Sequence, residues 1–473
     1  MPVMSPTPRE NDTTERVEVP LPRETSRELW LLVGVFLSAR LMSIWWFQPL
    51  HSEVGTFYFP FAWLQGRGVF PFLHYWFEHP PLLAYLVVAL RYLSLALCGA
   101  GDVAWERLCL VRTTQVASVV WELASLHLLY AMAKVLRGPK AATRACWVYV
   151  ALFSTGFVSL SFLETFPVFL MLASLYLAFY SKPAWSALVL AGGFMAKMLP
   201  VGILPAILKC DARWRWRFLS LVVFLGGVAA VAAPFLGAGR RWLLLSFECA
   251  AKRPPWTTAW ALLDRRYDFG YVGPGAKDQT PDFFAERSGF GVVPWAREVL
   301  EGVPREVFGP PGMNRLVFYH IAAHFATNLA FLDSRPRTGE TFLWVYGGVG
   351  VALGVFYLLT FARMPSALPP RRRLFLGAFT MFLVFFYAKG WSPQFVLYLV
   401  PLLLIAFPLG EGGLWSLAFT ILVFLEMPVW VVYVHGRPDL LMADQLLLHG
   451  ITIARTALLL IVAARLYPRL FND

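Results

Sequence analysis

The chain has 473 residues, of which 58% are hydrophobic and 16% aromatic, and its formal net charge is +12. Its mean hydropathy is +0.58, and apolar runs recur from residue 29 almost to the C-terminus, so we predict an all-α, polytopic membrane protein. Lys and Arg lie beside these runs, which excludes a nucleic-acid-binding surface. The five cysteines show no metal-type spacing, which argues against a thiol or disulfide role.

The chain divides into four predicted parts. Residues 1–28 are polar and carry charges of both signs, so we expect a disordered cytoplasmic tail, and no signal-peptide cleavage site follows the first apolar run. We then expect an N-terminal transmembrane module at 29–236, with a first outer loop at 49–79, an outer segment at 237–340 and C-terminal transmembrane helices at 341–473. With about 20 residues per crossing, the apolar runs predict about 10 to 13 transmembrane helices.

Charge asymmetry predicts the orientation. Arg16, Arg23 and Arg27 precede the first helix, whereas the loop 49–79 contains only Arg67, so the N-terminus is expected in the cytoplasm and the loop outside. The same rule puts the basic segments "KCDARWRWR" (209–217) and "RMPSALPPRRR" (363–373) inside. The segment 237–340 then shares the outer face with the first loop.

One basic loop, "RGPKAATR" at 137–144, leaves the topology open. Simple alternation of the helices places this loop outside and Glu164 inside, against the charge rule. Two broken or re-entrant segments between 80 and 208 would reverse both placements. The segment 184–208 is a candidate for a break, since it contains Gly192, Gly193, Lys197, Pro200 and Pro205.

The first outer loop concentrates ionisable side chains among many aromatic residues. Two acids, Glu53 and Glu78, and three histidines, His51, His74 and His79, lie within about 30 residues. An aromatic belt at the membrane surface explains the aromatic residues but not the carboxylates. A carboxylate held above the bilayer can act as a general base or bind a metal, and the alternative is a solvated loop charge.

The double proline at 80–81 predicts where the next helix begins. Proline suits the first turn of a helix, where its missing N–H is not needed, and it keeps the preceding residue out of helical angles. We therefore expect the pair to set the direction in which Glu78 and His79 point.

Ionisable residues inside apolar runs are functional candidates, because a charge at the bilayer centre costs about 2.5–3.5 kcal/mol on insertion scales. In chain order they are Arg40, Glu122, Lys134, Glu164, Lys197, Lys389 and Glu426. Lys134 and Glu426 lie near predicted helix ends, from which they could reach the interface. For Arg40 and Glu122, a buried ion pair and a role in substrate binding both stay open.

The outer segment contains two stretches with helix signals. "TTAWALLDRRY" (257–267) predicts a helix with Thr257 or Thr258 as its N-cap, and "LVFYHIAAHFATNLAFL" (316–332) predicts an interfacial helix. Arg253, in "KRPPW", is expected at the membrane edge. No internal repeat is visible, which lowers the expectation of a secondary transporter.

A last motif, "YAKGWSPQFVLYLVPLL" (387–403), breaks one apolar run and starts another. Lys389 ends the first run, and Ser392 with Pro393 predicts an N-cap and first position of the next helix. Free N–H groups beside a lysine suit an anion such as phosphate, and the alternative is an ordinary turn between helices.

These elements, in this order, resemble the polytopic glycosyltransferases of the GT-C superfamily. The matching residues of the first loop are Glu53, Tyr58, Ala62, Gly66 or Gly68, Pro71, Glu78, His79, Pro80, Pro81 and Leu82. "KMLP" (197–200) and "KGWSPQF…LVPLL" are similar to motifs of the bacterial polyprenol-phosphate-mannose-dependent branch and of the GPI mannosyltransferases. The resemblance spans most of residues 29–410 and rests on short motifs whose order and sidedness agree.

The resemblance implies a GT-C-like fold whose extracytoplasmic loops carry amphipathic helices. It implies transfer of a sugar, mannose or another hexose or pentose, from a polyprenyl-phosphate donor to a glycan, lipid or protein acceptor. The active site would lie on the extracytoplasmic face of the plasma membrane, with Glu53 as catalytic base and Glu78 as a second catalytic residue at the lip of the donor or acceptor site. The expected substrate-binding residues are Tyr58, His79, Glu164, Lys197, Arg253, Lys389, Ser392 and Gln394.

Departures from the family pattern keep alternatives open. The branch usually has Asp where Glu53 stands and often Tyr where His79 stands. No cofactor is certain, and a divalent metal on Glu78, His79 and His74 is an alternative, as some GT-C enzymes use one. Membrane lipids are expected partners, whereas nucleic acid is not.

Two other functions compete with the enzyme. A transporter or flippase of a lipid-linked substrate would spread ionisable residues across the bilayer to both sides, whereas an enzyme would gather them on one face. A GT-C-fold scaffold without catalytic activity would fit a non-functional Glu53.

Overall fold

The computed structural model describes residues 23–46, 52–75, 77–237, 240–247 in part, 255–264, 304–308, 340–427 and 442–471. These residues are helical or irregular, with two isolated β-bridges, so the all-α prediction is confirmed for this part of the chain. In chain order the α-helices are α1 (Arg23–Trp46), α2 (Phe59–Gln65), α3 (Pro81–Cys98), α4 (Val103–Arg137), α5 (Pro139–Ala151), α6 (Phe153–Ser161), α7 (Thr165–Phe179), α8 (Pro183–Ala196), α9 (Leu204–Leu208), α10 (Trp214–Ala232), α12 (Ala259–Leu263), α17 (Glu340–Arg363), α18 (Pro370–Tyr387), α19 (Val396–Ala406), α20 (Leu409–Phe424) and α21 (Met442–Leu466).

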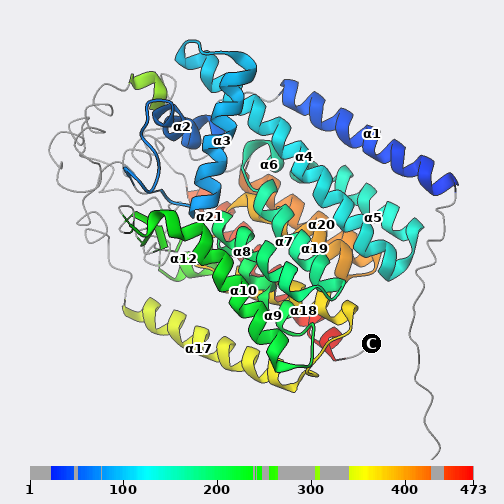
Figure 1. Ribbon diagram of the computed structural model, residues 1–473. Helices are drawn as coiled ribbons and strands as arrows, with labels where there is room; N and C mark the ends of the chain where they lie inside the picture. Colours follow the sequence, from blue (N-terminus) through cyan, green and yellow to red (C-terminus); the bar gives the residue numbers. More distant parts are fainter. Residues whose placement is uncertain are drawn as a thin grey trace, which may run out of the picture.

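The helices pack into one bundle, with α1 and α17 on opposite outer sides (Figure 1). Helix α1 begins at Arg23, inside the segment predicted as a tail, and residues 1–22 lie outside the described residues.

Several helices are long and apolar enough to cross a membrane. In the described part there are seven, α1, α3, α4, α10, α17, α20 and α21, or eight if the bent pair α5–α6 is one span. The shorter apolar helices α7, α8, α9 and α19 lie among them, which leaves room for the predicted total of about 10 to 13 crossings. Large apolar side chains face outward, including Trp30 at 75% exposure and Trp344 at 81%. Such surfaces fit a lipid environment, so this is a multi-pass membrane protein.

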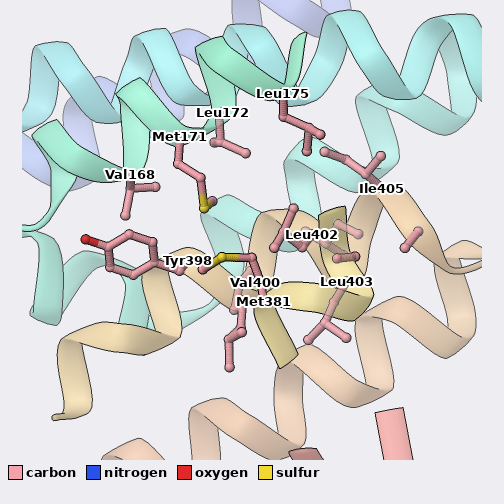
Figure 2. Packing of buried hydrophobic residues seen from close by; sticks show 14 of the residues in the cluster. Val168, Met171, Leu172, Leu175, Met381, Tyr398, Val400, Leu402, Leu403 and Ile405 are labelled. Atoms are coloured by element: carbon pink, nitrogen blue, oxygen red, sulfur yellow. The ribbon is translucent and has the colours of Figure 1, made fainter. Parts of the chain in front are cut away.

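Helix α19 occupies the centre of the bundle, because all of its residues are buried. Its sequence, "VLYLVPLLLIA", is apolar on every face except for the hydroxyl of Tyr398, and a helix that is apolar all round is stable only inside a core or a membrane. Figure 2 shows side chains of α7 and α18 packed against it, with the Tyr398 hydroxyl at one edge of the apolar cluster.

The predicted basic segments meet at one end of the bundle, called here the arginine end. The ammonium group of Lys209 donates to the carbonyls of Phe361, Met364 and Pro365 at 2.9, 3.2 and 3.1 Å, which joins the segments 209–217 and 363–373. Arg137 and Arg371 line one cavity, so the loop 137–144 lies at this end too.

Glu164 lies at the opposite end, called here the acidic end. Helix α7 starts directly after Glu164, and the carbonyl of Ala178 near its other terminus accepts a 2.7 Å hydrogen bond from Arg373 of the basic segments. This arrangement corresponds to the second of the two predicted topologies.

The predicted break in the segment 184–208 is confirmed. Helix α8 ends at Ala196, and Lys197 has extended backbone angles (φ −155°, ψ 136°). A 3-10 turn, η3 (Leu199–Ile203), and α9 follow, each with a proline in its first turn, where the ring removes no helical hydrogen bond. The break leaves the Lys197 side chain at the end of α8.

Helix α3 starts at Pro81 after the cap residue Pro80, as the double proline predicts. It has the length and hydropathy of a span, but its contacts place it at the acidic end. Tyr85 donates to the carbonyl of Pro71 at 3.2 Å, and Arg91 pairs with Glu106, in the first turn of α4, at 2.6 Å. Helix α4 reaches the level of the start of α7 only at Trp121, whose ring lies 5.1 Å from that of Phe166. The α3–α4 hairpin therefore projects beyond α7 (Figure 1).

Candidate functional site

The local sequence around Glu53 holds its backbone rigidly at the acidic end. The buried hydroxyl of Ser52 accepts a 3.0 Å hydrogen bond from the N–H of Gly55, and its carbonyl accepts one of 3.1 Å from Thr56. These bonds hold the chain directly before a short π-helical segment, η2 (Val54–Tyr58), whose N-cap position is Glu53, and η2 continues into α2, whose residues are all buried. The carboxyl group of Glu53 extends from the first turn of this buried platform.

The surroundings of Glu53 bring the pKa of its carboxyl group close to neutral pH. The residue is half-buried, and burial raises the pKa of its carboxyl from the usual 4.5 to about 7, with the carboxylates of Glu164 and Glu78 acting in the same direction. The ammonium group of Lys197 and the backbone N–H of Leu163, which donates to Glu53, act in the opposite direction. A carboxyl group with a pKa near 7 has the proton affinity that suits a general base at neutral pH.

Lys197 and Glu164 form the centre of the site. Lys197 donates to Oε1 of Glu164, which is fully buried, and Tyr398 of α19 donates to Oε2 at 2.7 Å. The ring of Phe395 lies 5.7 Å from the Lys197 ammonium. Both oxygens of Glu164 are therefore occupied, and the break after α8, the start of α7 and the start of α19 meet at this carboxylate.

Glu78, His79 and Tyr58 complete the same group. The ring of His79 lies 6.0 Å from that of Tyr58, and the carboxylate of Glu78 is close enough to interact electrostatically with Glu53 and Lys197. The buried hydroxyl of Tyr58 has no hydrogen-bond partner among the described residues. Three carboxylates thus surround one lysine, and we call Glu53, Glu78, Glu164 and Lys197 the carboxylate cluster.

A second loop, residues 388–392, lies beside this cluster and contains Lys389. Its backbone pairs with the segment 255–258, since the N–H of Trp256 donates to the carbonyl of Lys389 at 3.0 Å and the N–H of Trp391 donates to that of Trp256 at 3.2 Å. Thr258 caps α12 by accepting from the N–H of Ala261 at 3.3 Å, as predicted. Phe395, three residues after this loop, connects it to Lys197.

Close approach in this loop requires glycine at position 390. A Cβ atom there would lie 1.9 Å from ring carbons of Trp256. We expect Gly390→Ala to lower the stability by about 1–3 kcal/mol, as overpacking does, and to lower the Tm in detergent. The control is Gly226→Ala in α10, where nothing lies within 4 Å of the added methyl. Equal Tm values for the two variants would contradict the pairing of the loop with Trp256.

Two other charged pairs are structural. Arg40 binds Glu122 through two hydrogen bonds of 3.0 and 2.8 Å, and Ser159 donates to the same carboxylate at 3.0 Å, so the ion-pair alternative holds for these residues. Glu426, expected near the interface, is instead buried, and it accepts from Arg455 at 2.6 Å and from the Trp391 indole at 3.1 Å.

The structure brings together only some of the predicted site residues. Glu53, Tyr58, Glu78, His79, Glu164 and Lys197 meet, while Lys389, Ser392 and Gln394 lie in and after the neighbouring loop. Ser392 holds the N-cap position of the 3-10 turn η6 (Pro393–Phe395) but makes no side-chain cap bond. Arg253 and the stretch 316–332 lie outside the described residues.

The predicted metal alternative finds no support. Among the residues with assigned positions, no three His, Cys, Asp or Glu side chains gather as metal ligands, so Glu78, His79 and His74 do not form such a site. The Nδ1 atom of His74 instead accepts a 2.8 Å hydrogen bond from the N–H of Phe70.

Sequence reasoning missed Tyr398 and Arg455. The available signals were a single tyrosine in an otherwise aliphatic helix and an arginine inside the last apolar run.

The fold and the site define a polytopic helical membrane protein with a cluster of carboxylates at one end of its bundle. No protein family and no curated protein matches the chain. Among solved structures, it is similar to the apo form of an oligosaccharyltransferase from Archaeoglobus fulgidus, with 12% identity and a TM-score of 0.41. The match covers 94% of this chain but only 56% of that enzyme. A likeness at this level does not assign the chain to a family.

Proposed function

We propose that this protein is a GT-C-type membrane glycosyltransferase that moves a sugar from a polyprenyl-phosphate donor to an acceptor hydroxyl at the acidic end. The observation that carries the proposal is the carboxylate cluster, in which half-buried Glu53 has a carboxyl pKa near 7 beside the lip of an apolar bundle. A site at this position can be reached by a lipid substrate from the membrane and by a water-soluble substrate from the solvent. The donor sugar is a hexose or pentose, with mannose the first choice from the resemblance of the motifs.

In the proposed reaction Glu53 takes the proton from the acceptor hydroxyl. The acceptor oxygen forms a bond to the anomeric carbon of the sugar, the bond from that carbon to the phosphate oxygen breaks, and the electron pair leaves with the polyprenyl phosphate. A base matched to the working pH contributes most when it is ionised and close to the attacking hydroxyl. Glu78, His79 and Tyr58 border this position and orient the acceptor.

The departing phosphate needs donors and positive charge. We assign this role to Lys389 and to the buried Gln394 of η6, with Lys197 at the boundary between the two loops. The Lys197 ammonium is already paired with Glu164, whose other carboxylate oxygen accepts from Tyr398, so its main task is to lower the repulsion that the three carboxylates exert on an incoming phosphate. By the positive-inside rule, the arginine end and the N-terminus face the cytoplasm and the site faces away from it.

The interior of the helix bundle does not support the transporter alternative. Arg40 and Glu122 satisfy one another in a two-bond pair, and the central helix α19 is apolar except for the Tyr398 hydroxyl at its edge. Neither feature offers a polar path between the two ends of the bundle.

The test is transfer by purified protein from a labelled polyprenyl-phosphate mannose to an envelope acceptor extract. We expect kcat/KM to rise about tenfold per pH unit below pH 7 and to level off above it, because the base must lose its proton and the pKa of Glu53 is about 7. The rising part of this pH profile reports the titration of the whole carboxylate cluster, because its groups are coupled. Initial rates from pH 5 to 9 measure it.

A rate that is independent of pH down to pH 5 would place the base in a more polar environment than that of Glu53. Movement of intact donor across vesicles without sugar transfer would instead favour a flippase.

A further inference from the structure

The arginine end contains a cavity whose charge the mechanism does not use. Its volume is about 400 Å³, within the range of small-ligand pockets. It lies where the ends of α4, α18 and α19 meet the C-terminal turn η8 (Pro468–Leu470), and its lining includes Arg137, Arg371, Arg469, Phe375, Ile405 and Pro408.

The arginines of this cavity carry more positive charge than their protein partners neutralise. Arg137 donates to the carbonyls of Leu404, at 3.0 Å, and Ile405. Arg469 donates to the carbonyl of Ala406 at 2.8 Å and to Glu411 at 2.9 Å, a carboxylate that Arg465 shares at 3.2 Å. Among the described residues, neither Arg137 nor Arg371 pairs with a carboxylate.

The geometry keeps these like charges close together. The guanidinium groups of Arg371 and Arg469 are near enough to repel that of Arg137. Two helices, α18 and α20, also begin beside the cavity, at Pro370 and Leu409, and helix N-termini attract anions. Three arginines from three segments and two helix N-termini therefore converge on one hollow.

We propose that this cavity binds a phosphate group, at the end of the bundle opposite the carboxylate cluster. Helix α18 separates the two places by about 27 Å, at 1.5 Å for each of its 18 residues. The planar guanidinium groups suit phosphate oxygens, which accept paired N–H bonds. Because the pocket lies at one end of a membrane-spanning bundle, where lipid headgroups and water meet, the phosphate can belong to an anionic phospholipid or to a small water-soluble compound. The proposal does not depend on the sugar-transfer reaction.

Arg371 is the residue to change, because it is exposed and makes no hydrogen bond to the described protein, so its loss leaves the helix ends capped. The full-length protein in a neutral detergent is heated with inorganic phosphate, dioctanoyl phosphatidylglycerol or dioctanoyl phosphatidylcholine, and Tm is measured against concentration. Binding to the folded state raises Tm. The matched control is Arg363→Gln, an exposed arginine at the end of α17 outside the cavity.

We expect phosphate or phosphatidylglycerol to raise the Tm of the wild type, and Arg371→Gln to weaken the apparent affinity at least about tenfold while Arg363→Gln leaves it unchanged. A response to inorganic phosphate identifies a water-soluble ligand, and a response to phosphatidylglycerol alone identifies a lipid. No response to any probe, or equal responses in Arg371→Gln and wild type, would overturn the proposal and leave the arginines as helix caps.

Discussion

Replacing Glu53 by glutamine is expected to lower the rate of sugar transfer by about 10²- to 10⁴-fold, the usual contribution of a general base. The amide keeps the size of the side chain and can still accept the hydrogen bond from the N–H of Leu163, but it cannot take a proton. Transfer from labelled polyprenyl-phosphate mannose measures the effect at pH 8. The matched control, Glu306→Gln, changes an exposed carboxylate and is expected to keep full activity.

The Tm of Glu53→Gln shows whether a loss of transfer comes from the loss of the base or from unfolding of the variant. The pKa of the Glu53 carboxyl is higher in the folded protein, at about 7, than its usual 4.5, so between these values the folded state holds the proton more tightly. The folded state therefore loses stability as the pH rises from about 4.5 to about 7, and this cost is fully present at pH 8. Glutamine carries no such cost, so the variant should melt at or above the wild-type Tm at pH 8.

The two measurements together test whether Glu53 is the base. A stable variant without transfer supports Glu53, whereas a stable variant with wild-type transfer moves the base to Glu78 or Glu164. Absence of transfer in both proteins would favour another donor, a transporter or a scaffold.

Removing the guanidinium of Arg455 is expected to cost about 3–5 kcal/mol of stability, because it leaves the buried carboxylate of Glu426 without a counter-ion. Arg455 also donates to the carbonyl of Thr257 and lies 4.6 Å from the ring of Trp391, so it supports the loop 388–392. Arg455→Met should therefore lower the Tm and loosen this loop. Chemical denaturation in mixed micelles measures the free energy of unfolding.

A second substitution tests the electrostatic reason. In Arg455→Met with Glu426→Gln, the uncompensated charge is gone and the amide can still accept from the Trp391 indole, so much of the stability should return. The control Arg465→Met breaks a pair whose arginine is 61% exposed and should cost at most about 1 kcal/mol. Equal losses in the single and double variants would show that Arg455 acts through its packing and its bond to Thr257, and not as the counter-ion of Glu426.

The sequence by itself determined the membrane class, the shared end of the basic segments 209–217 and 363–373, and the positions of two helix boundaries. These are local properties: hydropathy over about 20 residues, charges beside apolar runs, and prolines that end or begin a helix. Pro80 and Pro81 set the start of α3, and the glycines, lysine and prolines of 184–208 marked a true break.

Only the tertiary structure decided which charges meet. Lys197 reaches Glu164 across 33 positions and Tyr398 reaches it across 234, and no periodicity records such distances along the chain. Helix packing also decides that Arg455 is the partner of Glu426 and that the loop 137–144 lies beside the other basic segments, so neither could be predicted from the sequence. A charge in an apolar run marks a cost of burial that the fold must offset, but which side chain offsets it depends on how the helices pack.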